Sequence, residues 1–153
     1  MCCYLIIKLG AIGDVAMATT MASELRRANP SARLTWVVGS AAKPLLQAMG
    51  IVDEIITANE EAILHGSLAQ KMRAVWSVWR SLGRRKFDVC LIPYRDWRYH
   101  ILRAGVHCKE VRSFRHDVRG PHQGAWPHLL LQEKRYCVKV CYLYFDNVLR
   151  NKI

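Results

Sequence analysis

The residues best suited to chemistry follow an apolar run near the N-terminus, where Lys8 precedes the loop 10–14. A helical pattern begins at Asp14, so this carboxylate is expected at a helix N-terminus, where free backbone N–H groups favour its ionised form. An ionised carboxylate in such a place could take a proton from a hydroxyl group. Asp is also among the commonest helix-capping residues, and a capping role is the alternative for Asp14.

Two glycines and a lysine lie close to Asp14 in the sequence. Gly10 and Gly13 let the backbone turn tightly and let a ligand approach closely. The loop has neither the G-x-G-x-x-G dinucleotide fingerprint nor the Gly-Lys-Ser/Thr ending of a P-loop. Lys8 could hold a phosphate or a carboxylate, or it could be a strand-end lysine whose ammonium reaches solvent. The spacing leaves both roles of Lys8 open.

A second group of candidates mixes basic and aromatic residues. Such mixing suits anionic sugars or single-stranded nucleic acid, although most of these arginines are expected on a solvated face. The basic members are Arg95, Arg98, Arg103, Lys109, Arg112, Arg115 and Arg119. The aromatic members are Tyr94, Trp97, Tyr99 and Phe114. No RNA-binding signature accompanies them.

Histidine and cysteine spacing argues against a metal site. The six His and six Cys form no H-x-x-x-H pair and no C-x-x-C pair, so a metal site built from them is not expected. No other cofactor is expected either. The cysteines are expected to be reduced thiols of a cytoplasmic protein.

Alternating apolar runs and helical patterns are expected to position these residues. Strands are predicted over 4–7, 34–38, 53–57, 87–93 and 110–114. Helices are predicted over 14–28, 41–49, 68–86, 95–104 and 128–149, with a loop over 116–127. This alternation predicts an α/β fold, a Rossmann-like parallel sheet with helices on both faces. Ligands bind at the C-terminal edge of such sheets, which would gather residues 8–14, 39–40, 93–98 and 115–116 around one mouth.

Periodicity and local signals add detail to two of the helices. In the first helix, Met17, Met21 and Leu25 recur at four-residue spacing on one face. In the third, Ser67 and Gln70 stand in capping-box positions, and residues 84–86 are expected to close the helix with positive charge. The apolar stripe of this third helix contains Leu68, Met72, Val75, Trp76, Trp79 and Leu82.

Length and charge limit the classes of protein. The chain has 153 residues, of which 52% are hydrophobic, enough for one packed domain and too apolar for a disordered tail. Residues 1–60 carry five basic and five acidic groups, whereas residues 61–153 carry 18 and seven and therefore the whole net charge of +11. The second part is expected to face an anionic partner. No apolar run is long enough to span a bilayer.

The segments YLIIKLGAIGDV (4–15), LRRANP (25–30), LTWVVG (34–39) and VDEII (52–56) together resemble glycosyltransferase family 9, the lipopolysaccharide heptosyltransferase family. The resemblance is close over residues 4–57, fair over 87–92 and the basic stretch that follows, and weak beyond 114. It implies a GT-B enzyme, with two Rossmann-like domains facing across a cleft. Residues 1–153 would be the single acceptor-side domain, and the donor-nucleotide domain would be absent. The chain would then be truncated and depend on a donor domain for activity.

The resemblance also implies a reaction and roles for residues. Heptose would pass from ADP-heptose to the inner core of lipopolysaccharide, with inversion and without a metal. Asp14 would be the general base. The residues expected to border or bind the anionic acceptor are Lys8, Gly10, Ala11 and Gly13, joined by Arg95, Arg98 and Arg115 from the basic stretch.

Partners and alternatives follow from the same features. The expected partners are an anionic lipid-linked glycan, a nucleotide-sugar held by the missing domain, and the cytoplasmic face of the inner membrane, but not nucleic acid. One alternative is a stand-alone binding module that holds an anionic glycan, a lipid headgroup or nucleic acid through its basic half. Another is a non-functional remnant with an exposed interdomain face. The identity of the sugar and the oligomeric state stay open.

Overall fold

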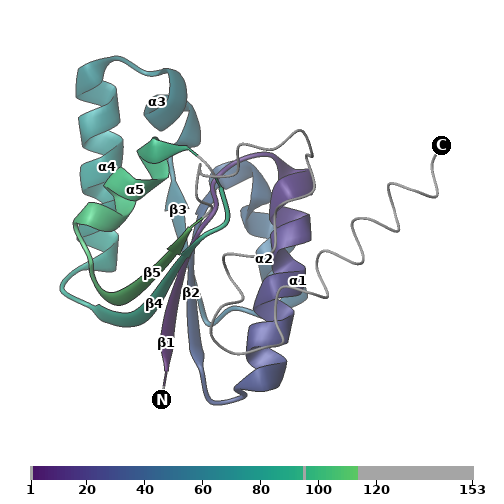
Figure 1. The fold of residues 1–153 in the computed structure, drawn as a ribbon. Helices are drawn as coiled ribbons and strands as arrows, with labels where there is room; N and C mark the ends of the chain where they lie inside the picture. Colours follow the sequence, from purple (N-terminus) through teal and green to yellow (C-terminus); the bar gives the residue numbers. More distant parts are fainter. Residues whose placement is uncertain (1, 95, 114–153) are drawn as a thin grey trace, which may run out of the picture.

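A computed structural model describes residues 2–94 and 96–113, which fold around one parallel sheet (Figure 1). Its five strands are β1 (Cys3–Ile7), β2 (Arg33–Gly39), β3 (Glu54–Ala58), β4 (Lys86–Ile92) and β5 (His107–Ser113). The helices are α1 (Ile12–Ala28), α2 (Lys43–Met49), α3 (Glu60–His65), α4 (Leu68–Leu82) and α5 (Trp97–Ala104), with a 3-10 turn at Ser40–Ala42. The strand order β3-β2-β1-β4-β5 is parallel throughout, which confirms the predicted Rossmann-like α/β class.

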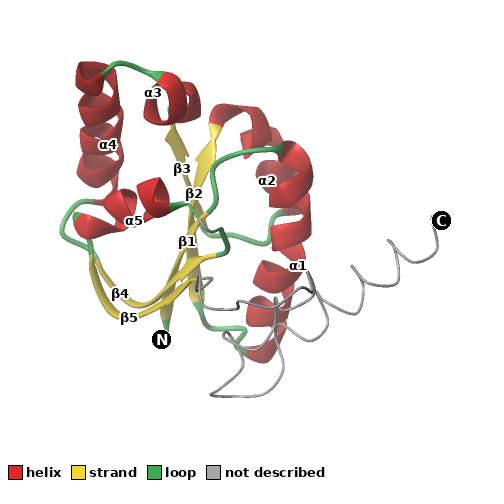
Figure 2. Ribbon diagram, turned by 45° about the horizontal axis from the view of Figure 1, so that its top comes forward, coloured by secondary structure: helices red, strands yellow, loops and turns green. Residues whose placement is uncertain are grey.

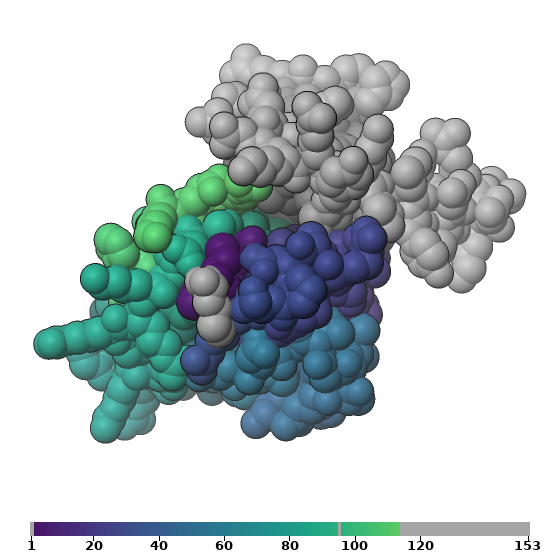
Figure 3. Space-filling view, turned by 90° about the horizontal axis from the view of Figure 1, so that it is seen from below, coloured from purple at the N-terminus to yellow at the C-terminus, as the bar shows by residue number. Residues whose placement is uncertain are grey.

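Helices cover both faces of this sheet. Helices α1 and α2 lie on one side, and α3, α4 and α5 lie on the other (Figure 2). Seen from the end where the strands begin, the purple N-terminal residues lie between the blue and the teal segments, as expected for a central first strand (Figure 3).

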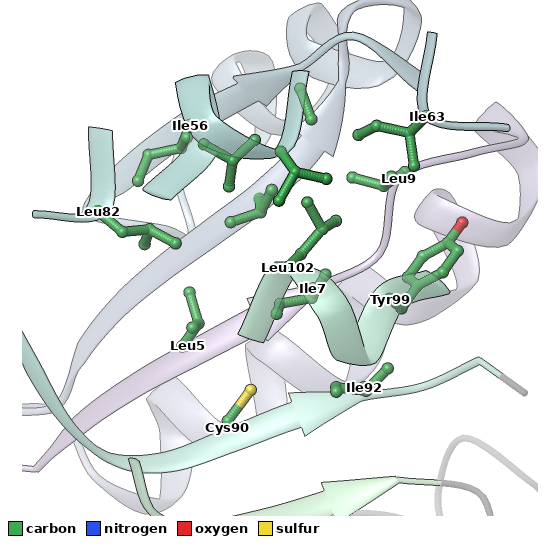
Figure 4. Close-up of a cluster of buried hydrophobic side chains, with 14 of the residues drawn as sticks. Leu5, Ile7, Leu9, Ile56, Ile63, Leu82, Cys90, Ile92, Tyr99 and Leu102 are labelled. Carbon is green, nitrogen blue, oxygen red and sulfur yellow. The ribbon is translucent and has the colours of Figure 1, made fainter. Parts of the chain in front are cut away.

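Strand β1 is apolar on both sides because it contributes to two cores. Leu5 and Ile7 pack beneath α3–α5, together with Leu82 of α4 and Leu102 of α5 (Figure 4). Ile6 points the other way, into the cluster beneath α1 and α2. Burying each such side chain contributes about 1.5–3 kcal/mol relative to leaving it in water. The continuous apolar run of this strand is thus explained by a sheet that is covered twice.

Local signals fix several helix ends. The predicted capping box is present, since Ser67 Oγ accepts from Gln70 N and Gln70 Oε1 accepts from Ser67 N at 2.7 Å. Gly50 ends α2 in the left-handed region, with φ of 60°. Helix α3 was not expected from the sequence, because its six residues are too short for helical periodicity. Its start signal is Asn59, whose side chain accepts from Ala62 N at 3.0 Å.

One expectation about the helices is wrong, and two predicted apolar faces are only partly buried. Helix α4 ends at Leu82, and Gly83 follows with φ of 62°, so residues 84–86 do not close the helix and Lys86 begins β4. The buried residues of α4 are Ala74, Val75, Val78 and Leu82 rather than the whole predicted stripe. In α1, Met17 is 40% exposed. Periodicity locates an apolar arc, but neighbouring elements decide how much of that arc is covered.

The remaining expectations concern the end of the chain and membranes. The loop predicted over 116–127 and the helix predicted over 128–149 lie outside the described residues.

Within residues 2–94 and 96–113, no helix combines the length and apolar character that a membrane span requires.

Candidate functional site

A small open cavity of about 190 Å³ lies at the C-terminal edge of the sheet. Its walls come from the segments that follow β1, β3 and β4. Strands β1 and β4 are neighbours in the sheet, and β2 lies between β1 and β3. The lining residues are Lys8, Gly10, Ala11, Asp14, Glu60, Leu64, Tyr94, Asp96, Arg98 and Tyr99. The predicted mouth thus brings together the loop after β1 and the start of α5.

Lys8 and Asp14 form an ion pair in this cavity. Lys8 Nζ lies 2.8 Å from Asp14 Oδ2 and 4.0 Å from the centre of the Tyr94 ring. The Lys8 side chain is 4% exposed, whereas that of Asp14 is 41% exposed. Lys8 is therefore not a strand-end lysine that reaches solvent, because its ammonium is buried and held by a carboxylate and an aromatic face. The carboxylate remains open toward the cavity mouth.

Asp14 is in the first turn of α1 and does not cap the helix. Helix α1 begins at Ile12, its N-cap position is Ala11, and no side chain makes a capping hydrogen bond there. The side chain of Asp14 is instead directed to Lys8. The amino end of α1 adds a favourable field for a negative group at this place.

The backbone of the loop is bent at Ala11. This residue has φ of 46° and ψ of 113°, and it is the one non-glycine residue with positive φ among those described. The Cβ atom makes such a conformation costly, so the surrounding structure must hold it. The bend leads the chain from β1 into α1 and sets the direction of the helix that carries Asp14.

Glu60 is a cavity residue that the sequence analysis missed. A Cβ atom added to Gly10 would lie 1.7 Å from Glu60 Oε1, and one added to Gly39 would lie 2.6 Å from Glu60 Oε2. The carboxylate thus occupies the space that two absent side chains leave free. Nothing lies within 4 Å of a Cβ added to Gly13. The available signal was Asn59, a capping residue that follows a predicted strand and precedes an acidic residue.

Arg98 lines the cavity but is largely engaged within the protein. Its Nε lies 2.9 and 2.8 Å from the two carboxylate oxygens of Asp96, and its Nη1 donates to the Leu64 carbonyl at 3.0 Å. Hydrogen bonding from Arg98 holds the pKa of Asp96 below its usual value. Arg98 therefore ties the end of α3 to the start of α5, and much of its charge is balanced by Asp96. Arg95 and Arg115 lie outside the described residues.

Tyr99 supports the loop from beneath. It is 2% exposed, and burial raises its pKa to about 12, with a further increase from the charge of Glu60. Backbone hydrogen bonds from Gly10 and Leu9 to the phenol oppose this increase. Its ring centre lies 5.0 Å from that of Tyr94. The phenol is therefore neutral at physiological pH and anchors the backbone that leads to Asp14.

The cavity offers hydrogen-bonding groups of both kinds. It contains three carboxylates, two cations and two phenols, which suits a ligand rich in hydroxyl groups better than an apolar one. Among residues 2–94 and 96–113, no three His, Cys, Asp or Glu side chains are grouped closely enough to hold a metal ion. The open carboxylate of Asp14 is suited to accepting a proton from a bound hydroxyl.

No protein-family model matches the chain. A curated relative is the lipopolysaccharide core heptosyltransferase OpsX of Haemophilus influenzae, with 26% identity over 121 residues. The match covers 79% of this chain and 32% of the relative, so the chain spans about a third of the length of that relative.

Solved structures show the same fold. A family 9 glycosyltransferase from Veillonella parvula matches with a TM-score of 0.63 and 19% identity, over 72% of this chain and 31% of that one. The E. coli heptosyltransferase WaaC with ADP matches with a TM-score of 0.64 and 15% identity, over 95% of this chain and 47% of that one. In sequence and in fold, the chain is thus similar to the heptosyltransferases of glycosyltransferase family 9, which confirms the predicted resemblance.

Proposed function

We propose that this chain forms the acceptor-side domain of a heptosyltransferase-like glycosyltransferase of lipopolysaccharide core biosynthesis. The sequence similarity to a core heptosyltransferase supports the reaction class. The observation that carries the proposal is the half-open carboxylate of Asp14, paired with buried Lys8 beside a glycine loop at the C-terminal sheet edge. A second Rossmann-like domain, facing this one across a cleft, would hold the donor nucleotide.

In the proposed reaction, a hydroxyl group of the inner core enters the cavity beside Asp14. The carboxylate accepts the hydroxyl proton while the oxygen attacks the anomeric carbon of ADP-heptose. A new C–O bond forms, the bond from that carbon to the diphosphate breaks, and ADP leaves with the bonding pair. Attack on the face opposite to ADP inverts the anomeric configuration. The scheme uses no metal ion or other cofactor.

Lys8 has a positioning role in this proposal. Its ammonium holds Asp14 Oδ2 at 2.8 Å, which directs the other carboxylate oxygen toward the cavity. Fixing a reacting group in one orientation lowers the entropic part of the barrier. The backbone of Gly10, Ala11 and Gly13 would border the acceptor. Arg98 would hold the cavity wall in place by joining α3 to α5, because Asp96 already balances its charge.

Two further features of the proposal concern the acceptor. An inner core carries negative charge and is attached to lipid, so Arg95 and Arg115 remain candidates for binding it. A lipid-linked acceptor also requires the enzyme to work at a membrane surface, and we propose peripheral contact with the cytoplasmic face of the inner membrane.

The test is sugar transfer by the 153-residue chain fused to the donor-nucleotide half of the Haemophilus relative. With ADP-heptose and a heptose-free inner-core acceptor, the fusion is expected to release ADP and form the heptosylated product. Asp14→Asn should lower kcat by about 10²–10⁴, the usual contribution of a general base. Glu24→Gln is the matched control, since Glu24 lies on the same helix, outside the cavity, and pairs with Arg27.

Two outcomes would contradict the proposal. Full activity of Asp14→Asn would remove the general base. A fusion that binds the acceptor tightly but transfers no sugar would favour the stand-alone binding module.

A further inference from the structure

Helix α4 exposes three large apolar side chains in one line. Leu68, Met72 and Trp76 are 77%, 58% and 66% exposed, and their four-residue spacing places them along one face of the helix. Single exposed apolar residues are common on protein surfaces, but a continuous stripe of large ones marks a surface that binds something.

This stripe is not what holds α4 on the protein. The helix packs through Ala74, Val75, Val78 and Leu82, which are all buried. Trp79 attaches it to α5 as well, because Trp79 Nε1 donates to the Ile101 and Leu102 carbonyls at 3.2 and 3.0 Å. The exposed stripe therefore lies at the edge of a face that is already anchored, and it is free to contact a partner.

The segment of chain that carries the stripe has charges of one sign. No Asp or Glu occurs from residue 62 to residue 87, a segment that contains Lys71, Arg73, Arg80, Arg84, Arg85 and Lys86. At about 100° per residue, Arg80 and Arg73 lie about 40° and about 60° from Trp76 around the helix. Both are exposed, and neither has an acidic partner among the described residues. An apolar stripe beside a cationic face is typical of helices that lie in the surface of an anionic membrane.

We propose that this face of α4 (Leu68, Met72 and Trp76 with Arg73 and Arg80) binds the surface of an anionic lipid bilayer. Charge complementarity favours lipid over a second copy of the chain, because a symmetric dimer through this face would bring the same arginines close together. The biological purpose of the contact rests on the proposed function. Helix α3 packs against α4 and supplies Glu60 and Leu64 to the cavity, so docking would hold the cavity close to a lipid-linked acceptor.

The test is co-sedimentation of the 153-residue chain with vesicles that contain no acceptor. Binding is expected to phosphatidylcholine vesicles that contain phosphatidylglycerol, to weaken as salt is added, and to be much weaker with phosphatidylcholine alone. The triple variant Leu68→Gln, Met72→Gln, Trp76→Gln should bind at least about tenfold less. Arg73→Gln and Arg80→Gln should each weaken binding about fivefold.

The controls lie on the opposite side of the sheet. Met17→Gln on α1 and Lys43→Gln on α2 remove an apolar side chain and a positive charge there, and both should bind as the wild type does. Thermal unfolding of the triple variant checks that these exposed substitutions leave the fold intact. Unchanged vesicle binding by the triple variant would overturn the proposal. So would wild-type self-association that the same three substitutions abolish, without vesicle binding. Because the vesicles carry no acceptor, a failure of the proposed transfer reaction would leave this result unaffected.

Discussion

Lys8 Nζ lies 2.8 Å from Asp14 Oδ2 and 4.0 Å from the centre of the Tyr94 ring. This relationship joins the residue that follows β1 to the first turn of α1, on the two sides of the glycine loop. The ammonium of Lys8 is buried, whereas the carboxylate of Asp14 is partly exposed. This arrangement suits the proposed general base, which must contact a substrate and keep one orientation.

Replacing Lys8 should change the stability of the protein little and lower the rate of sugar transfer more strongly. Lys8→Met keeps the volume of the buried chain and removes its charge, so the free energy of unfolding should change by less than about 1.5 kcal/mol. Transfer by the fusion should fall at least about tenfold in kcat, with a smaller effect on KM, because Asp14 loses its orienting partner. Urea unfolding and steady-state kinetics give the two values. Unchanged kcat would mean that the ion pair has no role in positioning Asp14.

The close contact between Gly10 and Glu60 predicts a strong coupling. Gly10→Ala should destabilise the protein by about 1 kcal/mol, because its Cβ would collide with Glu60 Oε1 and the carboxylate at the end of that side chain would have to move. Combining it with Glu60→Ala should restore much of this loss, which a double-mutant cycle measures. The control is Gly13→Ala, where the space is open and the residue is helical, so stability should rise by about 0.5–1 kcal/mol. Additive effects of the Gly10 and Glu60 substitutions would contradict the contact.

Backbone strain at Ala11 predicts an unusual response to glycine. Ala11→Gly should raise the free energy of unfolding by up to about 1 kcal/mol, because φ of 46° suits glycine better than alanine. At exposed Ala69 in α4, the same substitution should lower it by about 1 kcal/mol. Chemical denaturation of both variants checks the opposite signs. A similar loss at both positions would show that Ala11 is not strained.

The free energy of unfolding should fall at alkaline pH because Tyr99 loses its proton there. Burial raises the pKa of Tyr99 to about 12 from 10.0, so the folded state binds its proton more tightly than the unfolded state. This contribution is complete below pH 10 and is lost as pH rises from 10 toward 12. At neutral pH, Tyr99→Phe should cost about 1–3 kcal/mol, because the Gly10 and Leu9 amides lose their acceptor. The difference between wild type and Tyr99→Phe should therefore shrink above pH 10, as urea unfolding would show. A difference that is independent of pH would be contrary to this expectation.

The parts of the fold that local sequence determines were predictable. The strands were visible because a sheet covered on both faces requires continuous apolar runs, such as that of β1. The start of α4 was visible because Ser67 and Gln70 form a capping box within four residues. The exposure of Leu68 and Trp76 was not, because α3 and α5 decide which part of the α4 apolar arc is covered.

The site was predictable only in part. The glycine loop and Asp14 have local signals, but the ion pair with Lys8 depends on the bend at Ala11. Glu60 reaches the cavity from the far end of β3 through a helix too short for periodicity. Arg98 was assigned to the acceptor because its charge is evident in the sequence, whereas the hydrogen bonds that its guanidinium donates to Asp96 are not.

The central claim is that this chain holds the acceptor beside Asp14, and titration of the isotope-labelled chain followed by amide NMR tests it most directly. The ligands are a deacylated, heptose-free inner-core oligosaccharide and, separately, ADP-heptose. The acceptor-side assignment predicts that the oligosaccharide shifts the amide signals of Gly10, Ala11 and Gly13, that Asp14→Ala weakens this response, and that ADP-heptose leaves these signals unchanged. Shifts at the loop caused by ADP-heptose, with no response to the oligosaccharide, would contradict it.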